Sequence, residues 1–422
     1  MYRKFAILLA LLVAMPMLAS RPRIPSPDSL AALRAEVWNS WRQTWAASER
    51  TTSLPSLTPL SEARVTAWLL PDSLEPRALL RFRSGTKGTR PSSGWPCYVY
   101  LHGSGPREGE WKAGYAMAQR FDDAPSAYFI PQIPQEGAYY RWWQRSKQWA
   151  WHRLLRHLLA SPEVDPARLY LFGISEGGYG SQRLASYYAD YLAGAGPMAG
   201  GEPLRNAPVE NLGHVAFSLL TGENDAMFYR HMLTRLTGEA LDSMERLYAD
   251  EYVHRVELIP GCGHGIDYSP TTPWLNRYRR QAQPTHWRWE NFEMDGVKRN
   301  DFYNLEVIEE TDAERTTYEF RTGHDNVIEL TAERTAYDVT WTDPHWHIPM
   351  IFSRRYSPAE HGQLNLFLSE TMVDLTRPVE IRVNGRRLFR GRVKPSRQAM
   401  WRSAEIWGDP LRLFPVMVAL SW

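Results

Sequence analysis

Apolar side chains recur at helical spacing in residues 26–48, the first segment whose pattern predicts a folded element. Ser26 is placed to cap the first turn, and Pro27 suits the first helical position, where no backbone N–H is required. The pattern therefore predicts an amphipathic helix with one face packed on the rest of the protein. The apolar positions of that face are Leu30, Leu33, Val37, Trp41 and Trp45.

Further along, two extended stretches, 63–70 and 77–85, precede short apolar runs that alternate with helical patterns as far as residue 265. Strands that alternate with helices form a mostly parallel sheet with helices on both faces. We therefore predict the α/β class, with residues 21–283 as one domain. The expected strands include "CYVYLHGSG", "SAYFIPQIP", "RLYLFGIS", "AGAGPMAGG", "HVAFSLLTGEND" and "HRVELIPGCGHG".

Beyond residue 284 the pattern changes to strict alternation of apolar and polar residues, as in "TTYEFRT", "NVIELTA" and "PVEIRVNGRRLFRGRV". Such alternation is typical of strands with one buried face. Asn384-Gly385 stands between two alternating runs, which is a strong signal for a two-residue hairpin turn. Residues 284–422 are accordingly predicted to form a smaller all-β, sandwich-like domain.

The first twenty residues show the pattern of an export signal. Arg3 and Lys4 precede an apolar run, and the small residues Ala19 and Ser20 follow it. A membrane anchor is the alternative, but the run is shorter than the roughly 20 residues that span a bilayer. We expect residues 1–20 to be a signal peptide and the mature protein to be secreted or periplasmic, without stable membrane insertion.

Charge and cysteine content narrow the classes of partner. Lysine and arginine number 49 against 47 aspartates and glutamates, a net charge of +2, so no nucleic-acid partner is expected.

With Cys97 and Cys262 alone there is no disulfide framework and no zinc-type spacing. A single bridge between the two is the alternative to two free thiols. The sequence gives no oligomeric state.

One motif points to nucleophilic catalysis. Gly173-Ile174-Ser175-Glu176-Gly177 fits G-x-S-x-G and lies between an apolar strand and a predicted helix, where a nucleophile turn must lie. Glycines on either side of Ser175 suit a turn this sharp, because side chains there would clash with neighbouring backbone. Ser175 is therefore the predicted nucleophile.

A serine hydroxyl needs a base, and the base needs a carboxylate to hold its tautomer. Asp225 and His264 each follow a predicted strand, in the chain order acid then histidine, at the sheet edge where α/β sites form. Glu223 and, more weakly, Asp267 are the alternatives for the acid.

An oxyanion needs two preorganised donors. The predicted donors are the backbone N–H of Glu176, at the start of the helix after the nucleophile, and that of Ser104 in "LHGSG". His102, in the same motif, is expected to be structural.

In "LHGSG", "GISEGGYG", "TGEND" and "GCGHG", in this order, the chain resembles the α/β-hydrolase superfamily, and within it dienelactone-hydrolase, polyhydroxybutyrate-depolymerase-like and prolyl-oligopeptidase-like enzymes. The resemblance covers roughly residues 60–282. It implies Ser175 as nucleophile, Asp225 as acid and His264 as base, in a reaction without cofactor or metal.

The sequence defines the substrate less closely than it defines the catalytic residues. We expect a carboxylesterase that acts on a small-molecule or polysaccharide-linked ester, with Tyr179, Phe228 and Trp143 as candidate substrate-binding residues. A serine peptidase is one alternative, since the same triad cleaves amides, and a catalytically silent carbohydrate-binding protein is another. Further aromatic candidates are Tyr140 and Trp142. His345 and His347 are expected to be a surface pair rather than metal ligands.

Overall fold

The computed structural model describes residues 26–311, 313–345 and 347–422. The predicted signal peptide, residues 1–20, and Trp346 lie outside the described residues. Within the described part, every helix is too short or too polar to cross a bilayer.

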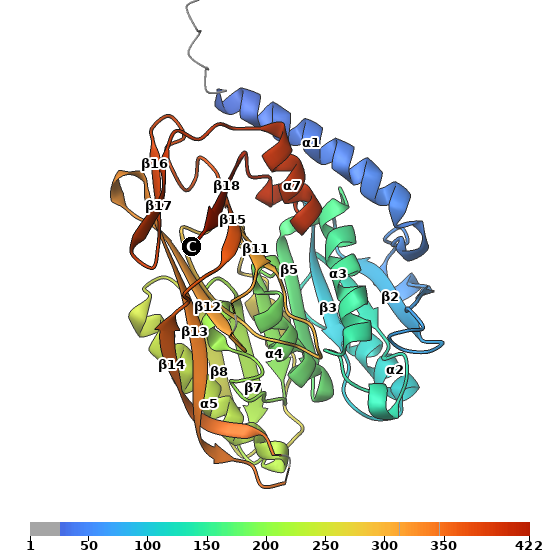
Figure 1. Ribbon diagram of the computed structural model, residues 1–422. Helices are drawn as coiled ribbons and strands as arrows, with labels where there is room; N and C mark the ends of the chain where they lie inside the picture. The colour runs from blue at the N-terminus through green and yellow to red at the C-terminus, as the bar shows by residue number, and fades with distance from the viewer. Residues whose placement is uncertain (1–25, 312, 346) are drawn as a thin grey trace, which may run out of the picture.

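A mixed eight-stranded sheet forms the centre of the larger part of the molecule (Figure 1). Its strand order is β1-β2-β4-β3-β5-β6-β7-β8, with antiparallel pairing at β1–β2 and β2–β4 and parallel pairing from β4 to β8. This confirms the predicted α/β class. The strands are β1 (Val65–Leu69), β2 (Leu79–Lys87), β3 (Trp95–Leu101), β4 (Ser126–Pro131), β5 (Val164–Ile174), β6 (Gly194–Met198), β7 (Ala216–Gly222) and β8 (His254–Ile259).

Helices cover both faces of this sheet because its central strands are apolar on both sides. In β3 the side chains of Cys97, Val99 and Leu101 join one hydrophobic cluster, and those of Tyr98 and Tyr100 join another on the opposite face. The α2 and α6 helices contribute to the tyrosine-rich face, and α3, α4 and α5 contribute to the other. The bounds are α2 (Arg107–Ala118), α3 (Arg145–Ala160), α4 (Glu176–Tyr187), α5 (Arg230–Leu247) and α6 (Thr271–Leu275).

The C-terminal part consists of two sheets, one in the order β10-β11-β15-β18 and one in the order β17-β16-β13-β12-β9, with β14 paired to β13. Asn384 and Gly385 both have positive φ in the turn between β16 and β17, as the predicted hairpin requires. The strands are β9 (His286–Asn291), β10 (Asp301–Phe302), β11 (Leu305–Glu309), β12 (Thr316–Thr322), β13 (Val327–Thr342), β14 (Pro349–Pro358), β15 (Gln363–Leu368), β16 (Val379–Val383), β17 (Arg386–Gly391) and β18 (Val416–Ser421).

One helix interrupts this β-rich part, α7 (Arg397–Trp407), which the alternating pattern did not predict. It packs against α1 (Pro27–Ser48), the predicted N-terminal helix, so two helices far apart in the sequence lie side by side (Figure 1). Ser26 caps α1 by accepting a hydrogen bond from the Ser29 backbone N–H. Val37 of α1 and Met400 of α7 are both buried in the contact.

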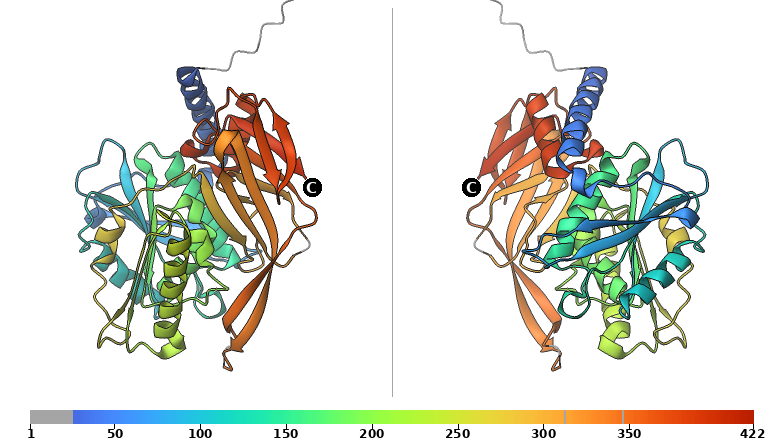
Figure 2. Two further views of the ribbon diagram at one scale, coloured as in Figure 1. Left: turned by 90° about the vertical axis from the view of Figure 1, so that its left-hand side faces the viewer. Right: turned by 90° about the vertical axis from the view of Figure 1, so that its right-hand side faces the viewer.

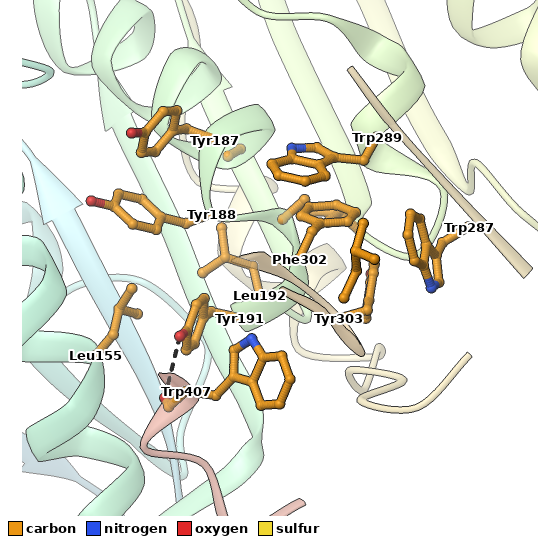
Figure 3. Packing of buried hydrophobic residues seen from close by; sticks show 14 of the residues in the cluster. Leu155, Tyr187, Tyr188, Tyr191, Leu192, Trp287, Trp289, Phe302, Tyr303 and Trp407 are labelled. Carbon is orange, nitrogen blue, oxygen red and sulfur yellow. Dashed lines mark hydrogen bonds between the residues drawn. The ribbon is translucent and has the colours of Figure 1, made fainter. Parts of the chain in front are cut away.

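The two parts share one hydrophobic core and a buried ion cluster. Aromatic residues of α4 and the following turn, including Tyr187 and Tyr191, lie close to Trp289, Phe302 and Trp407 of the C-terminal part (Figure 3). Beside them Asp190, fully buried, binds Arg299 at 2.5 Å and Arg412 at 2.5 Å. The predicted domain boundary near residue 284 stays a prediction, since the core is continuous across it.

The hairpin of β13 and β14 extends from the C-terminal part as an arm alongside the α/β part (Figures 1 and 2). Midway along it, Arg354 binds Glu210 at 2.9 Å and Glu290 at 2.9 Å. At its tip, the Trp341 ring meets the Tyr229 ring edge to face, with centroids 5.7 Å apart. Tyr229 follows β7 in the same loop as Asp225, so the arm reaches the loop of the predicted acid.

Candidate active site

Ser175 occupies a sharp turn between β5 and α4. Its φ of 56° and ψ of −114° are strained for a side-chain-bearing residue. The flanking glycines allow the turn: a Cβ on Gly173 would lie 2.4 Å from the Gly177 carbonyl oxygen, and one on Gly177 would lie 2.0 Å from the Leu101 carbonyl oxygen. The backbone crowding thus explains the glycine pattern and holds the serine at the carboxyl edge of the sheet.

The structure brings Ser175, His264 and Asp225 together although they are far apart in the sequence. His264 Nε2 lies 3.0 Å from Ser175 Oγ, and His264 Nδ1 lies 2.7 Å from Asp225 Oδ2. Because a carboxylate only accepts, Nδ1 carries the proton and Nε2 is left to accept from the serine hydroxyl. Asp225 is buried, whereas 47% of the His264 side chain is exposed, so solvent reaches the imidazole and not the carboxylate.

The alternative acids have other partners. Glu223 Oε2 accepts from the Gly261 backbone N–H at 3.1 Å, and Asp267 Oδ1 accepts from the Ser269 backbone N–H at 2.9 Å. Both are therefore loop-ordering groups, and Asp225 is the carboxylate bonded to His264.

The predicted oxyanion donors flank the nucleophile. Gly103 lies directly against Ser175, since a Cβ on Gly103 would be 3.4 Å from the Ser175 Cβ. Ser104 follows it and is exposed. Glu176 is the first residue of α4, and the first N–H groups of a helix have no partner within the helix. Both residues thus lie next to the predicted nucleophile; the role of their N–H groups stays a prediction.

His102 and Tyr140 fix the loop that carries Ser104. The Gly103 carbonyl accepts from His102 Nδ1 at 2.8 Å and from the Tyr140 hydroxyl at 2.9 Å. His102 Nε2 accepts from the Ile133 backbone N–H at 3.0 Å, and burial lowers the pKa of His102 to about 4, so the ring is neutral. Since the Gly103 carbonyl and the Ser104 N–H belong to one planar peptide unit, anchoring the first orients the second.

The candidate substrate-binding residues all contact arginines near the nucleophile. Tyr179 lies one turn after Ser175, and the Arg230 guanidinium lies 5.7 Å from its ring centroid and 5.2 Å from that of Phe228. The Phe228 side chain is 44% exposed. Trp143 is stacked under Arg183 at 4.0 Å.

By contrast, Trp142 is fully buried and donates from Nε1 to the His102 carbonyl at 3.0 Å, and Tyr140 is buried as well. These two residues of the aromatic run support the active-site loops from within the core.

Sequence reasoning missed three features of the site. Arg230 donates to Asp225 from α5, and Arg141 lies 3.5 Å from Glu176. Only the short spacing between Asp225 and Arg230 could have indicated their contact, and no sequence pattern indicated that Arg141 lies close to Glu176. The arm contact between Trp341 and Tyr229 was missed too, because it joins the two parts of the chain.

No metal site adjoins the triad in the part of the chain that the structure describes. The one group of potential ligands found there is Asp242, Glu245 and His254, on α5 and β8, with both carboxylates exposed. It does not include His345 or His347, which are both exposed. Cys97 and Cys262 are free thiols, and burial raises the pKa of Cys97 to about 12.

No protein-family model matches the sequence, and no curated protein matches it. Among solved structures the chain is similar to a thermostable esterase, with a TM-score of 0.39 and 18% identity over 52% of this chain and 64% of that one. It is also similar to a ferulic acid esterase from Anaeromyces mucronatus, with a TM-score of 0.37 and 12% identity over 54% of this chain and 93% of that one. A poly(3-hydroxybutyrate) depolymerase from Bordetella parapertussis gives a TM-score of 0.37 and 16% identity over 48% and 84% of the two chains.

The strand order, the helices on both faces and the strand-to-helix turn at Ser175 define an α/β-hydrolase fold. Within that fold the chain carries an assembled serine, histidine and aspartate in hydrogen-bonded series, joined to a smaller β-rich part.

Proposed function

We propose that the protein is a serine hydrolase that cleaves carboxylic esters through an acyl-enzyme on Ser175. The observation that carries the proposal is the continuous series from Ser175 Oγ to His264 Nε2, at 3.0 Å, and from His264 Nδ1 to Asp225 Oδ2, at 2.7 Å. These are the distances at which a base takes the proton of a nucleophile and is itself oriented by a carboxylate.

In the proposed reaction His264 removes the hydroxyl proton as Ser175 Oγ attacks the ester carbonyl carbon. The Ser104 and Glu176 N–H groups stabilise the resulting oxyanion, and Asp225 stabilises the imidazolium. His264 then returns the proton to the departing alcohol, which leaves the acyl group on Ser175. Water, activated by His264, releases the acid and restores the serine.

Two further parts of the proposal, export of the protein and the kind of ester it cleaves, rest on the sequence. The charged and apolar pattern of residues 1–20 supports export, and the aromatic residues near the nucleophile support an ester attached to a carbohydrate. The chemistry is complete with the triad and water, so the proposal includes no cofactor.

A peptidase that recognises a free N-terminus is less well supported. An ammonium group is best held by acidic side chains that lack positive neighbours. Here Arg141, Arg183 and Arg230 all lie close to the nucleophile turn and its carboxylates. The assembled triad also gives no support to a catalytically silent binding protein.

The direct test is hydrolysis of short-chain p-nitrophenyl esters and methyl hydroxycinnamates by the mature protein, together with labelling by a fluorophosphonate. Wild type should turn over an ester and label at Ser175, and Ser175→Ala should do neither. Ser243→Ala, at an exposed serine on α5, is the matched control and should behave as wild type. Absence of labelling in folded wild-type protein would refute the proposal.

A further inference from the structure

Three side chains of α4 form a polar stripe that begins at the nucleophile. Glu176, Tyr179 and Arg183 lie three and four residues apart, so they share one face of the helix. Arg183 binds Glu202 at 2.7 Å and covers the Trp143 ring, and Arg230 covers the rings of Tyr179 and Phe228. The polar stripe is thus bordered by aromatic side chains.

Glu176 is the unusual member of the polar stripe. The residue is only 9% exposed, yet its buried Oε1 has no hydrogen-bond partner among the described residues, and Oε2 lies 3.5 Å from Arg141. Burial raises the pKa of Glu176 to about 8, and Arg141 opposes this effect. A buried polar atom without a partner costs about 1–3 kcal/mol, and such atoms are rare in folded proteins.

The position of Glu176 indicates what would satisfy it. Its backbone N–H is the predicted oxyanion donor, and its carboxyl group belongs to the residue directly after the predicted nucleophile. Arg141, the ion-pair partner of Oε2, is half exposed, so it can move without disturbing the core. A group of the bound substrate can then donate a hydrogen bond to Oε1.

We propose that the polar stripe is a subsite for a hydroxylated part of the ester, with Glu176 Oε1 as acceptor for a substrate hydroxyl. This inference rests on the proposed esterase function and names its substrate class, esters of polyhydroxylated compounds such as sugars. A hydroxyl fits better than an ammonium group, because the guanidinium groups of Arg141, Arg183 and Arg230 surround the carboxyl groups and repel a cation.

The experiment measures kcat/KM for two acetates of equal ring size, a monoacetylated methyl glycoside and cyclohexyl acetate. The value for the glycoside is divided by the value for cyclohexyl acetate. In wild type the ratio should favour the glycoside by about tenfold or more, because a polar site left unpaired discriminates strongly. Glu176→Gln and Tyr179→Phe should each lower the ratio about tenfold. Glu239→Gln, which neutralises an exposed carboxylate on α5, should leave it unchanged.

A second readout does not depend on turnover: the methyl glycoside itself should slow fluorophosphonate labelling of wild type at millimolar concentration and should slow labelling of Glu176→Gln much less. Three results would each overturn the subsite. They are a wild-type ratio of kcat/KM values near one, equal ratios in wild type and Glu176→Gln, and preferential cleavage of an alanine ester over both acetates. Failure of the proposed function is distinguishable, because wild type would then not label at all.

Discussion

Arg230 Nη1 donates to Asp225 Oδ1 at 2.8 Å, while the other carboxylate oxygen of Asp225 accepts from His264. The predicted acid is therefore held from two sides, and both of its oxygens are occupied. Arg230 is buried at the start of α5 and also lies over Tyr179 and Phe228. One guanidinium group thus links the orientation of the triad to the aromatic side of the site.

Arg230→Gln is expected to lower kcat/KM for p-nitrophenyl acetate about tenfold or more. Hydrogen bonds to charged groups contribute about 1.5–3 kcal/mol, and the variant removes the charged partner of a buried carboxylate. Steady-state kinetics measure the effect, with circular dichroism to check folding. Arg235→Gln, at an exposed position of the same helix, is the control. Equal losses in both variants would argue against a positioning role for Arg230.

The identity of the acid can be tested by two neighbouring substitutions. Asp225→Asn should lower kcat by about 10³–10⁴, because an amide no longer selects the required tautomer of His264. Glu223→Gln should keep near wild-type kcat, since Glu223 contacts only a backbone N–H in the loop after β8. The reverse result would transfer the role of acid to Glu223.

Tyr140→Phe removes one of the two hydrogen bonds to the Gly103 carbonyl. We expect kcat to fall about threefold to tenfold with little change in KM, because a neutral hydrogen bond contributes about 0.5–1.5 kcal/mol and here orients a donor to the transition state. The variant keeps the ring and its packing. A change confined to KM would contradict the proposed orientation of the Ser104 N–H.

The raised pKa of Glu176 predicts a specific dependence of stability on pH. Its pKa of about 8 in the folded protein exceeds the value near 4.5 of an unperturbed glutamate. The stability that it contributes is therefore complete below about pH 4.5 and is lost as pH rises through about 8. The Tm of wild type should fall, relative to that of Glu176→Gln, between pH 5 and pH 9. Parallel Tm curves for the two proteins would show that the folded-state pKa is not raised.

Asp190 is expected to be essential for the junction of the two parts. Asp190→Asn removes the carboxylate that Arg299 and Arg412 share and leaves them with Asp301 and Asp409, respectively. Breaking a buried ion pair costs about 3–5 kcal/mol. Urea unfolding should show this loss in a single transition, because the hydrophobic core is continuous across the parts. Asp338→Asn, which breaks the exposed pair with Arg355, should change stability little. Two separate transitions in wild type would contradict a shared core.

Local pattern was sufficient for the elements and for much of the site. The period of apolar residues predicted α1 and the alternating strands and helices, and Asn384-Gly385 predicted the β16–β17 turn, since each depends on neighbours within a few residues. The positions of Ser175, Asp225 and His264 after the strands β5, β7 and β8 were readable for the same reason, because the carboxyl ends of parallel strands meet at one edge.

Contacts between distant segments were decided by the tertiary structure alone. The contacts of Arg141 with Glu176 and of Trp341 with Tyr229 join side chains whose sequence separation carries no periodic signal. The helix α7 and its packing on α1 likewise depend on which surfaces remain uncovered once both sheets have formed. The sequence by itself determined the fold class and the three residues of the triad, since strand order and motif position require only local information. The surroundings of the triad were decided by long-range packing, because the burial and charge of a group such as Glu176 depend on every element that closes around it.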